Sequence, residues 1–419
     1  MSSSEYAKTT SYQFDPRDAE VVENPGKAYS ELRARCPFHH VKDDKLEFWI
    51  TSDYDEIKNH VLKDNPVTDW TFKYGNSLVT YAYNTGIVTD MPEHAFWRSF
   101  LGQAVAPKPL QAMRPKIEAL TNSLLDNMLE KSHGELHHDY ALPTTGKVMC
   151  MLLGAPLENY ELYKHMGDEL MIGNYHETEG DRTQRVFKEL SAHFAVLVKE
   201  LRQKLKDAGI TEPAPEHVGK VIPEGYLSKC ITHKVDGRYF TDMEIFNMCA
   251  TFLTGGQETS TSLIMNCTWR LLQNRELWEQ VVANPDLVEI AVEESLRFDP
   301  PVLCQFRTST RPLEMHGQQL PEKAKLMWSI AGANRDPDIF ENPDEFRLDR
   351  PLATVRKHLA FGAGMHQCIG AALGRMDAQI AMRGLATRLP KLRLIGDGAA
   401  DRVLPWMNWG RTRLDVAWD

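Results

Sequence analysis

FGAGMHQCIG, residues 361–370, places a single cysteine, Cys368, among three glycines and directly before an apolar helical pattern. No second cysteine lies at a Cys-x-x-Cys spacing, and an isolated cysteine is most often a small buried hydrophobe. The glycines indicate something more specific, because they let the backbone approach another group closely. The start of a helix also offers N–H groups and a dipole that favour a thiolate. The stretch therefore makes Cys368 a candidate site.

The bulk composition excludes several classes of partner. The chain has 419 residues and a formal net charge of −10, which disfavours binding to nucleic acid or to an anionic membrane. Its seven cysteines are odd in number and scattered, which favours a reducing compartment over a disulfide framework. The first residues lack the apolar core of a secretory signal, and no run approaches the roughly 18 apolar residues of a membrane span. We therefore expect a cytoplasmic protein that binds neither nucleic acid nor membrane.

The hydrophobic periodicity predicts a mainly α chain with a small β portion. Thr241 and Glu244 form a capping box at the start of a long helix. Helical spacing extends over 112–134, 145–153, 185–207, 241–274, about 286–298 and about 369–389. Strands are expected at 48–52, in parts of 300–350 and around 405–410, and a Pro/Gly loop at 209–225. The stretch CPFHH (36–40) allows either a metal cluster or a turn entering a strand, and the turn is favoured because no partner ligands follow at zinc spacing.

The long helix is interrupted in its middle by GGQET, residues 255–259. Phe252, Gly256 and Thr259 share one face, which should be an unbroken apolar stripe. Each mid-helix glycine costs about 1 kcal/mol relative to alanine. Two interpretations remain open: a kink needed for packing, or a groove in which a ligand lies beside the helix. In the second interpretation Glu258 and Thr259, an acid and an alcohol, could relay protons.

Together with Glu294 and Arg297, which can pair at i, i+3 on a helix, these stretches resemble the cytochrome P450 family of soluble bacterial type. The pieces that carry the resemblance are GGQET (255–259), Glu294–Arg297, NRDPDIFENPDEFRLDR (334–350) and FGAGMHQCIG (361–370). The resemblance implies the cytochrome P450 fold, with haem between the long central helix and the cysteine loop. It implies one domain over 1–419, with a disordered tail at 1–12 and β-rich portions at about 36–52 and 300–350.

The resemblance also implies a set of haem-binding residues. Cys368 would be the thiolate ligand to the iron of haem b, and a thiolate ligand favours O–O cleavage. Phe361 would shield the ligand loop, Gly362 and Gly370 would admit backbone N–H groups near the sulfur, and Gly256 would let haem approach the long helix. The propionates would be held by His94, Arg98, Arg307 and His366, with His358 as a further contact. The alternative for each is a solvated surface cation.

By the same resemblance Thr259 would hold iron-bound dioxygen and its protons, and Glu258 would supply protons. Gln257 departs from the smaller or apolar residues often found at its position, and it could perturb the water chain. Glu294 and Arg297, with Arg350 as third member, would form a structural buried cluster. The substrate pocket would include Ile87, Thr251, Gly255 and Leu303, and the aromatic-rich stretch 70–83 either covers this pocket or packs in the core.

The function implied is that of a haem-thiolate monooxygenase, which inserts one atom of O2 into a small to medium apolar organic substrate. Electrons would come from a separate ferredoxin and ferredoxin reductase, and the enzyme would be a monomer. Arg356, Lys357 and Arg375 are expected to be exposed where the ferredoxin docks. Three alternatives stay open: a haem-thiolate binding or sensor protein, a peroxide-using relative, and an enzyme with Cys368 as nucleophile beside His366. A sensor would not need Glu258 and Thr259, so their presence favours the monooxygenase.

Overall fold

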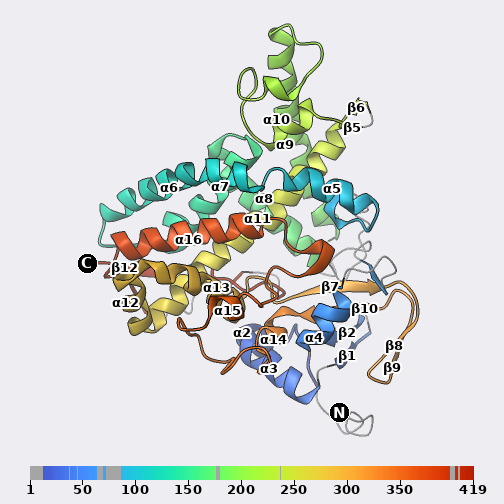
Figure 1. Ribbon diagram of the computed structural model, residues 1–419, viewed down its shortest axis with the longest axis vertical. Coiled ribbons are helices and arrows are strands. Elements are labelled where there is room, and N and C mark those ends of the chain that lie inside the picture. Colours follow the sequence, from blue (N-terminus) through green and yellow to red (C-terminus); the bar gives the residue numbers. More distant parts are fainter. Residues whose placement is uncertain are drawn as a thin grey trace.

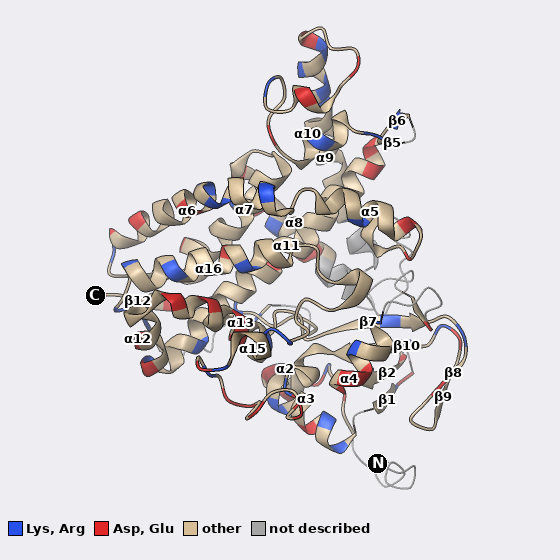
Figure 2. Cartoon of the chain, in the orientation of Figure 1, with Lys and Arg blue, Asp and Glu red and all other residues tan. Residues whose placement is uncertain are grey.

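A computed structural model of the chain describes residues 13–36, 38–44, 46–63, 69–71, 86–175, 180–235, 237–396, 402–403 and 406–419. The expected tail at 1–12 and most of the aromatic-rich stretch 70–83 lie outside these described residues. Helices exceed strands in the described part, which confirms the mainly α class with a small β portion. None of the helices described there is both long and apolar enough to cross a membrane. Lys, Arg, Asp and Glu are interspersed along the outer helices (Figure 2).

The central element is helix α11 (Asp242–Gln273), 32 residues long and running through the middle of the helical part (Figure 1). Its start is the predicted capping box: the Thr241 hydroxyl accepts from the Glu244 amide at 3.2 Å, and the Glu244 carboxylate accepts from the Thr241 amide at 2.8 Å. These bonds satisfy two of the N–H groups that a helix start leaves open. The helix is continuous through 255–259, despite the two glycines.

Helices α7 (Leu142–Leu153), α8 (Tyr160–Tyr175) and α16 (Ala371–Arg388) contact α11 and cover it with apolar side chains. Helix α6 (Pro107–Leu129) lies over α16 and starts five residues before the predicted segment, because Pro107 can occupy the first helical position without needing an N–H partner. The other helices are α2 (Ala19–Glu23), α3 (Pro25–Arg35), α4 (Tyr54–Glu56), α5 (Glu93–Gly102), α9 (Gly180–Asp207), α10 (Tyr226–Thr232), α12 (Arg275–Ala283), α13 (Val288–Phe298), α14 (Ile330–Ala333) and α15 (Leu352–Val355).

The β portion is a five-stranded sheet in the order β1-β2-β10-β7-β3, on the side of the molecule away from α9 and α10 (Figure 1). Strands β10 and β2 are parallel, and the other neighbours are antiparallel. The strands are β1 (Phe38–Lys42), β2 (Glu47–Thr51), β3 (Trp70–Thr71), β7 (Cys304–Ser309) and β10 (Lys325–Ser329). Strand β10 is buried along its whole length, as expected for a strand in the interior of a sheet.

The CPFHH stretch differs from the predicted turn: from Phe38 onward it is part of strand β1, which pairs antiparallel with β2. The Cys36 thiol donates to the Phe38 carbonyl at 3.2 Å, and His39 Nε2 lies 3.1 Å from the Phe14 carbonyl oxygen. His40 stacks on Trp49 with ring centroids 4.5 Å apart. Each of the three candidate ligands thus has a separate local contact, and they do not form a metal site among the described residues.

The C-terminal region differs from the sequence prediction. Within 405–410 the described residues form a turn, and Asn408 makes only an isolated bridge to Val302. Isolated backbone hydrogen bonds hold this segment in place of a strand ladder. The Leu303 amide donates to the Met407 carbonyl, and the Trp409 amide donates to the Pro301 carbonyl. The small sheets consist of β4 (His133–Glu135), β11 (Arg393–Leu394) and β12 (Asp415–Ala417), of β5 (Lys234–Val235) with β6 (Arg238–Tyr239), and of β8 (Leu313–Met315) with β9 (Gln318–Leu320).

Candidate functional site

The Cys368 loop is closed by its own backbone. The Cys368 amide donates to the Phe361 carbonyl at 2.8 Å, so both ends of the segment meet. Gly362 and Gly364 adopt φ values of +65° and +70°, which a side chain would disfavour. Helix α16 begins at Ala371, three residues after Cys368 rather than at it. The sequence therefore builds a tight loop that presents Cys368 just before a helix N-terminus.

The thiol of Cys368 faces open space inside the protein. Burial raises its pKa, although the amides of Gly370 and Ala371 and the charges of Arg98 and Arg375 oppose this effect. Yet of the seven cysteines, all of which the structure describes, Cys368 alone is exposed. Dense surroundings and an accessible surface occur together where a side chain borders an internal space. A metal bound there would deprotonate the thiol outright.

Helix α11 borders open space in the same way. Gly255 is exposed in the middle of this central helix, and a Cβ at that position would meet nothing within 4 Å. The half-buried Thr259 donates its hydroxyl to the Gly255 carbonyl at 2.7 Å. A Cβ on Gly256 would instead point at Met149 of α7, with 2.7 Å to its sulfur. The open side of the helix thus carries Gly255 and Thr259, whereas Gly256, which the sequence analysis placed on the same face as Thr259, packs against α7.

Four residues singled out from the sequence come together near Cys368. Arg98, on α5, donates to the carbonyl of Gln367 beside the cysteine. The ring of His94 lies 4.3 Å from that of His366, measured between centroids. Arg307 comes from β7 and is 5% exposed. We call these four residues, His94, Arg98, Arg307 and His366, the cation cluster.

The cation cluster holds more positive charge than the carboxylate beside it balances. Burial lowers the pKa of Arg307 to about 9, even though Asp90 raises it. Burial also lowers the pKa of Arg98 and of His366, and the His366 ring is 3.8 Å from the Asp90 carboxylate. Sequence reasoning missed Asp90, which stands four residues before His94. Buried guanidinium groups bind carboxylates well, so two propionates beside an open thiol fit this arrangement, and the residues present fit haem.

Glu258 is buried and points away from the open side of α11. Its carboxylate is 2.8 Å from Lys164 Nζ and accepts from the Ser262 hydroxyl at 2.9 Å. Successive helix residues are about 100° apart, so Glu258 faces α8 while Thr259 faces the open space. Lys164 and Ser262 were missed from the sequence; the i, i+4 spacing of Ser262 was the one available signal.

Two close approaches fix this part of α11. The Gln257 side chain donates to the Tyr160 carbonyl at 3.1 Å, so it lies between α11 and α8 rather than on the Thr259 side. On the Ser262 side, Gly410 of the C-terminal segment lies so near that a Cβ would be 2.1 Å from the Ser262 hydroxyl oxygen. Gln257 and Gly410 thus pack the two flanks of the segment that carries Glu258.

The four suggested pocket positions have different surroundings. Gly255 borders open space, and Ile87 is half-buried in the 3-10 turn Gly86–Val88. The Thr251 hydroxyl donates to the Asn247 carbonyl at 2.9 Å. Leu303 is 3% exposed and packs in the apolar cluster beneath the sheet.

The predicted structural cluster is confirmed in full. Glu294 binds Arg297 through both oxygens at 2.8 Å and binds Arg350 at 3.0 Å. Arg297 also donates to three carbonyl oxygens, those of Asn334, Pro343 and Glu345. Glu294 and Arg297 are 0% exposed. We call Glu294, Arg297 and Arg350 the balanced cluster.

Two expectations near the cysteine loop are wrong. His358 is not a haem contact: its Nε2 is 2.9 Å from the carboxylate of Glu293, and its Nδ1 accepts from the Ala360 amide at 3.2 Å. Arg375 is not an exposed cation: it binds Glu293 at 2.6 Å and lies 4.5 Å over the Phe361 ring. Sequence reasoning missed Glu293, a buried carboxylate that binds both side chains away from their expected places.

Comparisons with known proteins agree with this geometry. The cytochrome P450 family model matches residues 19–386. Cytochrome P450 109 from Bacillus spizizenii is 30% identical over 361 residues, covering 86% of this chain and 83% of the relative. The polyketide biosynthesis cytochrome P450 PksS from Bacillus subtilis is 26% identical over 398 residues, covering 91% and 92%. Its solved structure superimposes with a TM-score of 0.84 at 25% identity, covering 97% of this chain and 100% of that one.

Proposed function

The chain belongs to the cytochrome P450 family of haem-thiolate monooxygenases, and we propose that Cys368 is its iron ligand. Members of the family bind haem b through a cysteine thiolate. When bound, the haem activates O2, so that one oxygen atom enters an organic substrate and the other is reduced to water. The observation that carries the assignment is the exposed thiol of Cys368 in a glycine loop, surrounded by protein and next to the cation cluster.

The cation cluster would hold the two propionates of haem. Arg98 and Arg307 would form charge-assisted hydrogen bonds, and His94 and His366 would donate through ring nitrogens. The support is the meeting of these four side chains beside Cys368, with Arg307 buried and its pKa lowered by that burial. Phe361, Gly362 and Gly370 would shield the sulfur and keep side chains off it.

Proton supply would depend on the open side of α11. Thr259 would hold a proton at its hydroxyl oxygen, toward the space beside Gly255. Glu258, on the side of α11 that faces α8, would supply protons, which it would receive from Lys164 at 2.8 Å. Because Glu258 faces Lys164, it would deliver a proton either by changing its rotamer or through a water molecule that takes the place of Lys164. Gln257 would take no part, because its side chain is engaged with Tyr160.

The substrate would be a small to medium apolar organic molecule lying against Gly255 and Thr251, with Ile87 and Leu303 as further contacts. Of the similar proteins, one is named for polyketide biosynthesis and one for biotin biosynthesis, and a solved structure of CYP109E1 from Bacillus megaterium is a complex with corticosterone. The sensor alternative is less favoured, because a sensor would not need Glu258 and Thr259. The peroxide-using alternative is less favoured, because such relatives usually lack this pair of an acid and an alcohol.

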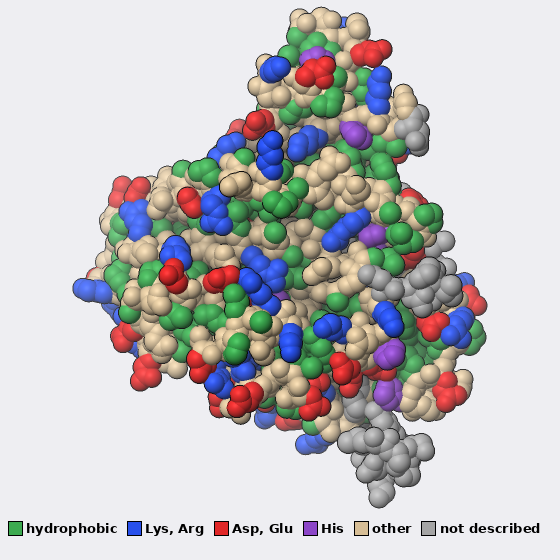
Figure 3. Space-filling model, viewed as in Figure 1, with side chains coloured by type: hydrophobic (Ala, Val, Ile, Leu, Met, Phe, Trp, Pro, Cys, Tyr) green, Lys and Arg blue, Asp and Glu red, His purple; other side chains and the backbone are tan. Residues whose placement is uncertain are grey.

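Electrons would come from a ferredoxin and its reductase to a monomeric, single-domain enzyme in the cytoplasm. Lys and Arg side chains gather near the centre of the face in Figure 3, across which α16 runs in Figure 1. Arg356 and Lys357, which follow α15, are exposed and would steer an acidic partner. Glu289, 2.7 Å from Arg356, weakens this patch.

The assignment of Cys368 is tested by replacing it with histidine. The reduced parent protein with carbon monoxide should show the strongly red-shifted band special to thiolate-bound haem, and Cys368→His should lose this band while keeping some haem. Cys36→Ser, a cysteine in a different part of the fold, should retain it. The same spectrum in Cys368→His and parent would refute the assignment.

The role of Thr259 is tested by Thr259→Ala. The variant should bind haem and consume electrons, but release most of them as hydrogen peroxide, because the hydroxyl that holds the proton is absent. The measurement is product formed per NAD(P)H oxidised with a substrate found by screening. The control is Thr268→Ala, which removes the same kind of hydroxyl-to-carbonyl bond farther along α11. Equal coupling in all three proteins would exclude this role.

A further inference from the structure

Three side chains that can bind a metal ion, those of Glu135, His137 and His138, lie together near the C-terminal end of the chain. Glu135 ends strand β4, and His137 begins the π-helical turn η4 (His137–Ala141). Strand β4 pairs with β12, which Figure 1 shows beside the C-terminus. One carboxylate oxygen and one nitrogen of each ring lie within 4.8 Å of one another. The haem site proposed around Cys368 uses none of these residues.

The carboxylate of Glu135 is held in a fixed orientation by backbone N–H groups. Its Oε1 accepts from the His137 amide at 3.0 Å and from the Leu414 amide at 2.7 Å, and its Oε2 accepts from the His138 amide at 2.8 Å. An ionised carboxylate has about four lone-pair sites, two on each oxygen. Donors from the described residues use three of these sites, so Oε2 keeps one for a further ligand.

The imidazole of His137 is the feature that a purely structural role leaves unexplained. It is 4% exposed, and neither Nδ1 nor Nε2 has a hydrogen-bond partner among the described residues. Burying a polar group without a partner is unfavourable, and an apolar side chain would fill the same volume without this cost. The bonds that Glu135 makes to the start of η4 account for the carboxylate, but they do not account for the two ring nitrogens.

His138 completes the group from the solvent side. Its side chain is exposed, and its ring stands at 80° to the ring of His137, with the two centroids 4.8 Å apart. Two ligands on one tetrahedral zinc ion are about 3.4 Å apart, because each bond from the metal to nitrogen or oxygen is about 2.0–2.2 Å long. A side chain at the surface can rotate, so a small movement of His138 would bring its nitrogen to this distance.

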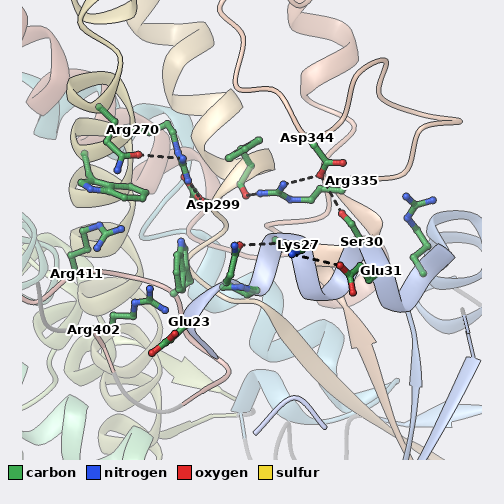
Figure 4. Close-up of a pocket in the computed structure, with 18 of the residues that line it drawn as sticks. Glu23, Lys27, Ser30, Glu31, Arg270, Asp299, Arg335, Asp344, Arg402 and Arg411 are labelled. Atoms are coloured by element: carbon green, nitrogen blue, oxygen red, sulfur yellow. Dashed lines mark hydrogen bonds and ion pairs between the residues drawn. The ribbon is translucent and has the colours of Figure 1, made fainter. Parts of the chain in front are cut away.

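The cleft beside α3 (Figure 4) differs from this group, because arginines in its wall have carboxylate partners within the chain. Arg270 binds Asp299 at 2.8 Å, and Arg335 binds Asp344 at 3.0 Å. These ion pairs resemble the balanced cluster and give no reason to infer a ligand. The buried ring of His137 is a different case, since donors and acceptors of the described chain leave both of its nitrogens unpaired.

We propose that Glu135, His137 and His138 bind a divalent transition-metal ion, and that zinc fits them best. Two imidazoles and one carboxylate are a ligand set that zinc takes, with a water molecule as the fourth ligand. Magnesium and calcium prefer oxygen ligands alone, so the two histidines disfavour them. The ion would join β4 to η4 and, through the Leu414 amide on Glu135, to the segment that leads into β12. Its role would be to stabilise this part of the fold.

The test is isothermal titration calorimetry of zinc chloride into the haem-loaded protein, after a chelator has removed loosely bound metal. One equivalent should bind saturably. His138→Gln should weaken this binding by about tenfold or more, because residues that only support a metal ligand already contribute about tenfold to affinity. His138 is exposed, so this variant is expected to fold. Zinc K-edge absorption spectra of the one-to-one complex should show nitrogen and oxygen neighbours at about 2.0–2.2 Å and no sulfur.

The control is His133→Gln, which removes an exposed histidine of β4 that lies outside the group. This variant should bind zinc as the parent does. Zinc should raise the melting temperature of the parent and of His133→Gln, and should raise that of His138→Gln by less. The proposal is overturned if zinc does not bind saturably, if His138→Gln binds zinc as tightly as the parent, if His133→Gln weakens binding as much as His138→Gln does, or if sulfur neighbours appear.

Discussion

The balanced cluster and the cation cluster both place arginine in the interior, yet they differ in what completes them. Arg297 has a bidentate partner in Glu294 and three carbonyl acceptors, all supplied by the chain. Arg307 donates to the Phe306 carbonyl at 2.9 Å and lies near Asp90, and burial lowers its pKa to about 9. A buried arginine that a carboxylate binds through both oxygens is structural, whereas one whose pKa burial lowers despite a nearby carboxylate suits an added anion.

Removing Arg297 gives the largest effect expected from this comparison. Arg297→Met leaves Glu294 as a buried carboxylate with fewer partners, and breaking such a pair typically costs about 3–5 kcal/mol. Because the partners belong to the chain, the loss should be the same with and without haem. Chemical denaturation of both forms measures it, with Arg383→Met, an exposed pair with Asp286, as a control costing less than about 1 kcal/mol. A loss confined to the haem-loaded form would break the distinction between the clusters.

Glu293 extends the comparison to acid pH. Burial alone would raise its pKa, but hydrogen bonds from His358 and Arg375 lower it to about 2, below the ordinary 4.5. A carboxyl group with a lowered pKa stabilises the fold above pH 4.5, and this stabilisation, about 3 kcal/mol, is lost as the pH falls toward 2. Glu293→Gln should therefore show a shallower loss of stability between pH 4.5 and 2 than the parent.

The measurement for Glu293 is the free energy of unfolding at several pH values. Glu289→Gln, on the same helix and exposed, is the matched control and should follow the parent. Parallel curves for parent and Glu293→Gln would show that the partners of Glu293 do not stabilise its charge. Burial also lowers the pKa of His358, so the stability contributed by its neutral form is lost as the pH falls below 6.5.

Arg98 gives the smallest effect and the clearest difference between the two clusters. Arg98→Leu should destabilise the haem-free protein only slightly, because what it loses there is a solvent-exposed hydrogen bond to the Gln367 carbonyl. The haem-loaded form should lose about 1–3 kcal/mol and release haem faster, as expected when a charged hydrogen bond is removed. Haem transfer to apomyoglobin and melting temperatures of both forms measure this, with the exposed Arg114→Leu as control. Equal losses in both forms would place Arg98 with the structural cations.

The features that could be predicted from residue spacing are those formed within one short segment of the chain. The capping box of α11, the glycine loop of Cys368 and the pairing of Glu294 with Arg297 depend on residues close together in the chain, where spacing determines geometry. The partners that were missed come from distant segments. Lys164 and Glu258 are 94 residues apart in the sequence, and Glu293 and Arg375 are 82 residues apart. Such contacts depend on how helices pack, which no local spacing encodes.

The approach of Gly410 to Ser262 has a consequence for how this sequence can change over evolutionary time. Gly410 has no unusual φ angle, so space alone excludes a larger residue: a Cβ there would lie 2.1 Å from the Ser262 hydroxyl oxygen and 3.0 Å from Val403. A lineage can therefore enlarge position 410 only after position 262 has become smaller, and the reverse order passes through a damaged intermediate. Since Ser262 donates to Glu258, that first step also removes a bond from the acid. Directed evolution of this enzyme should treat positions 262 and 410 as one unit, randomised together.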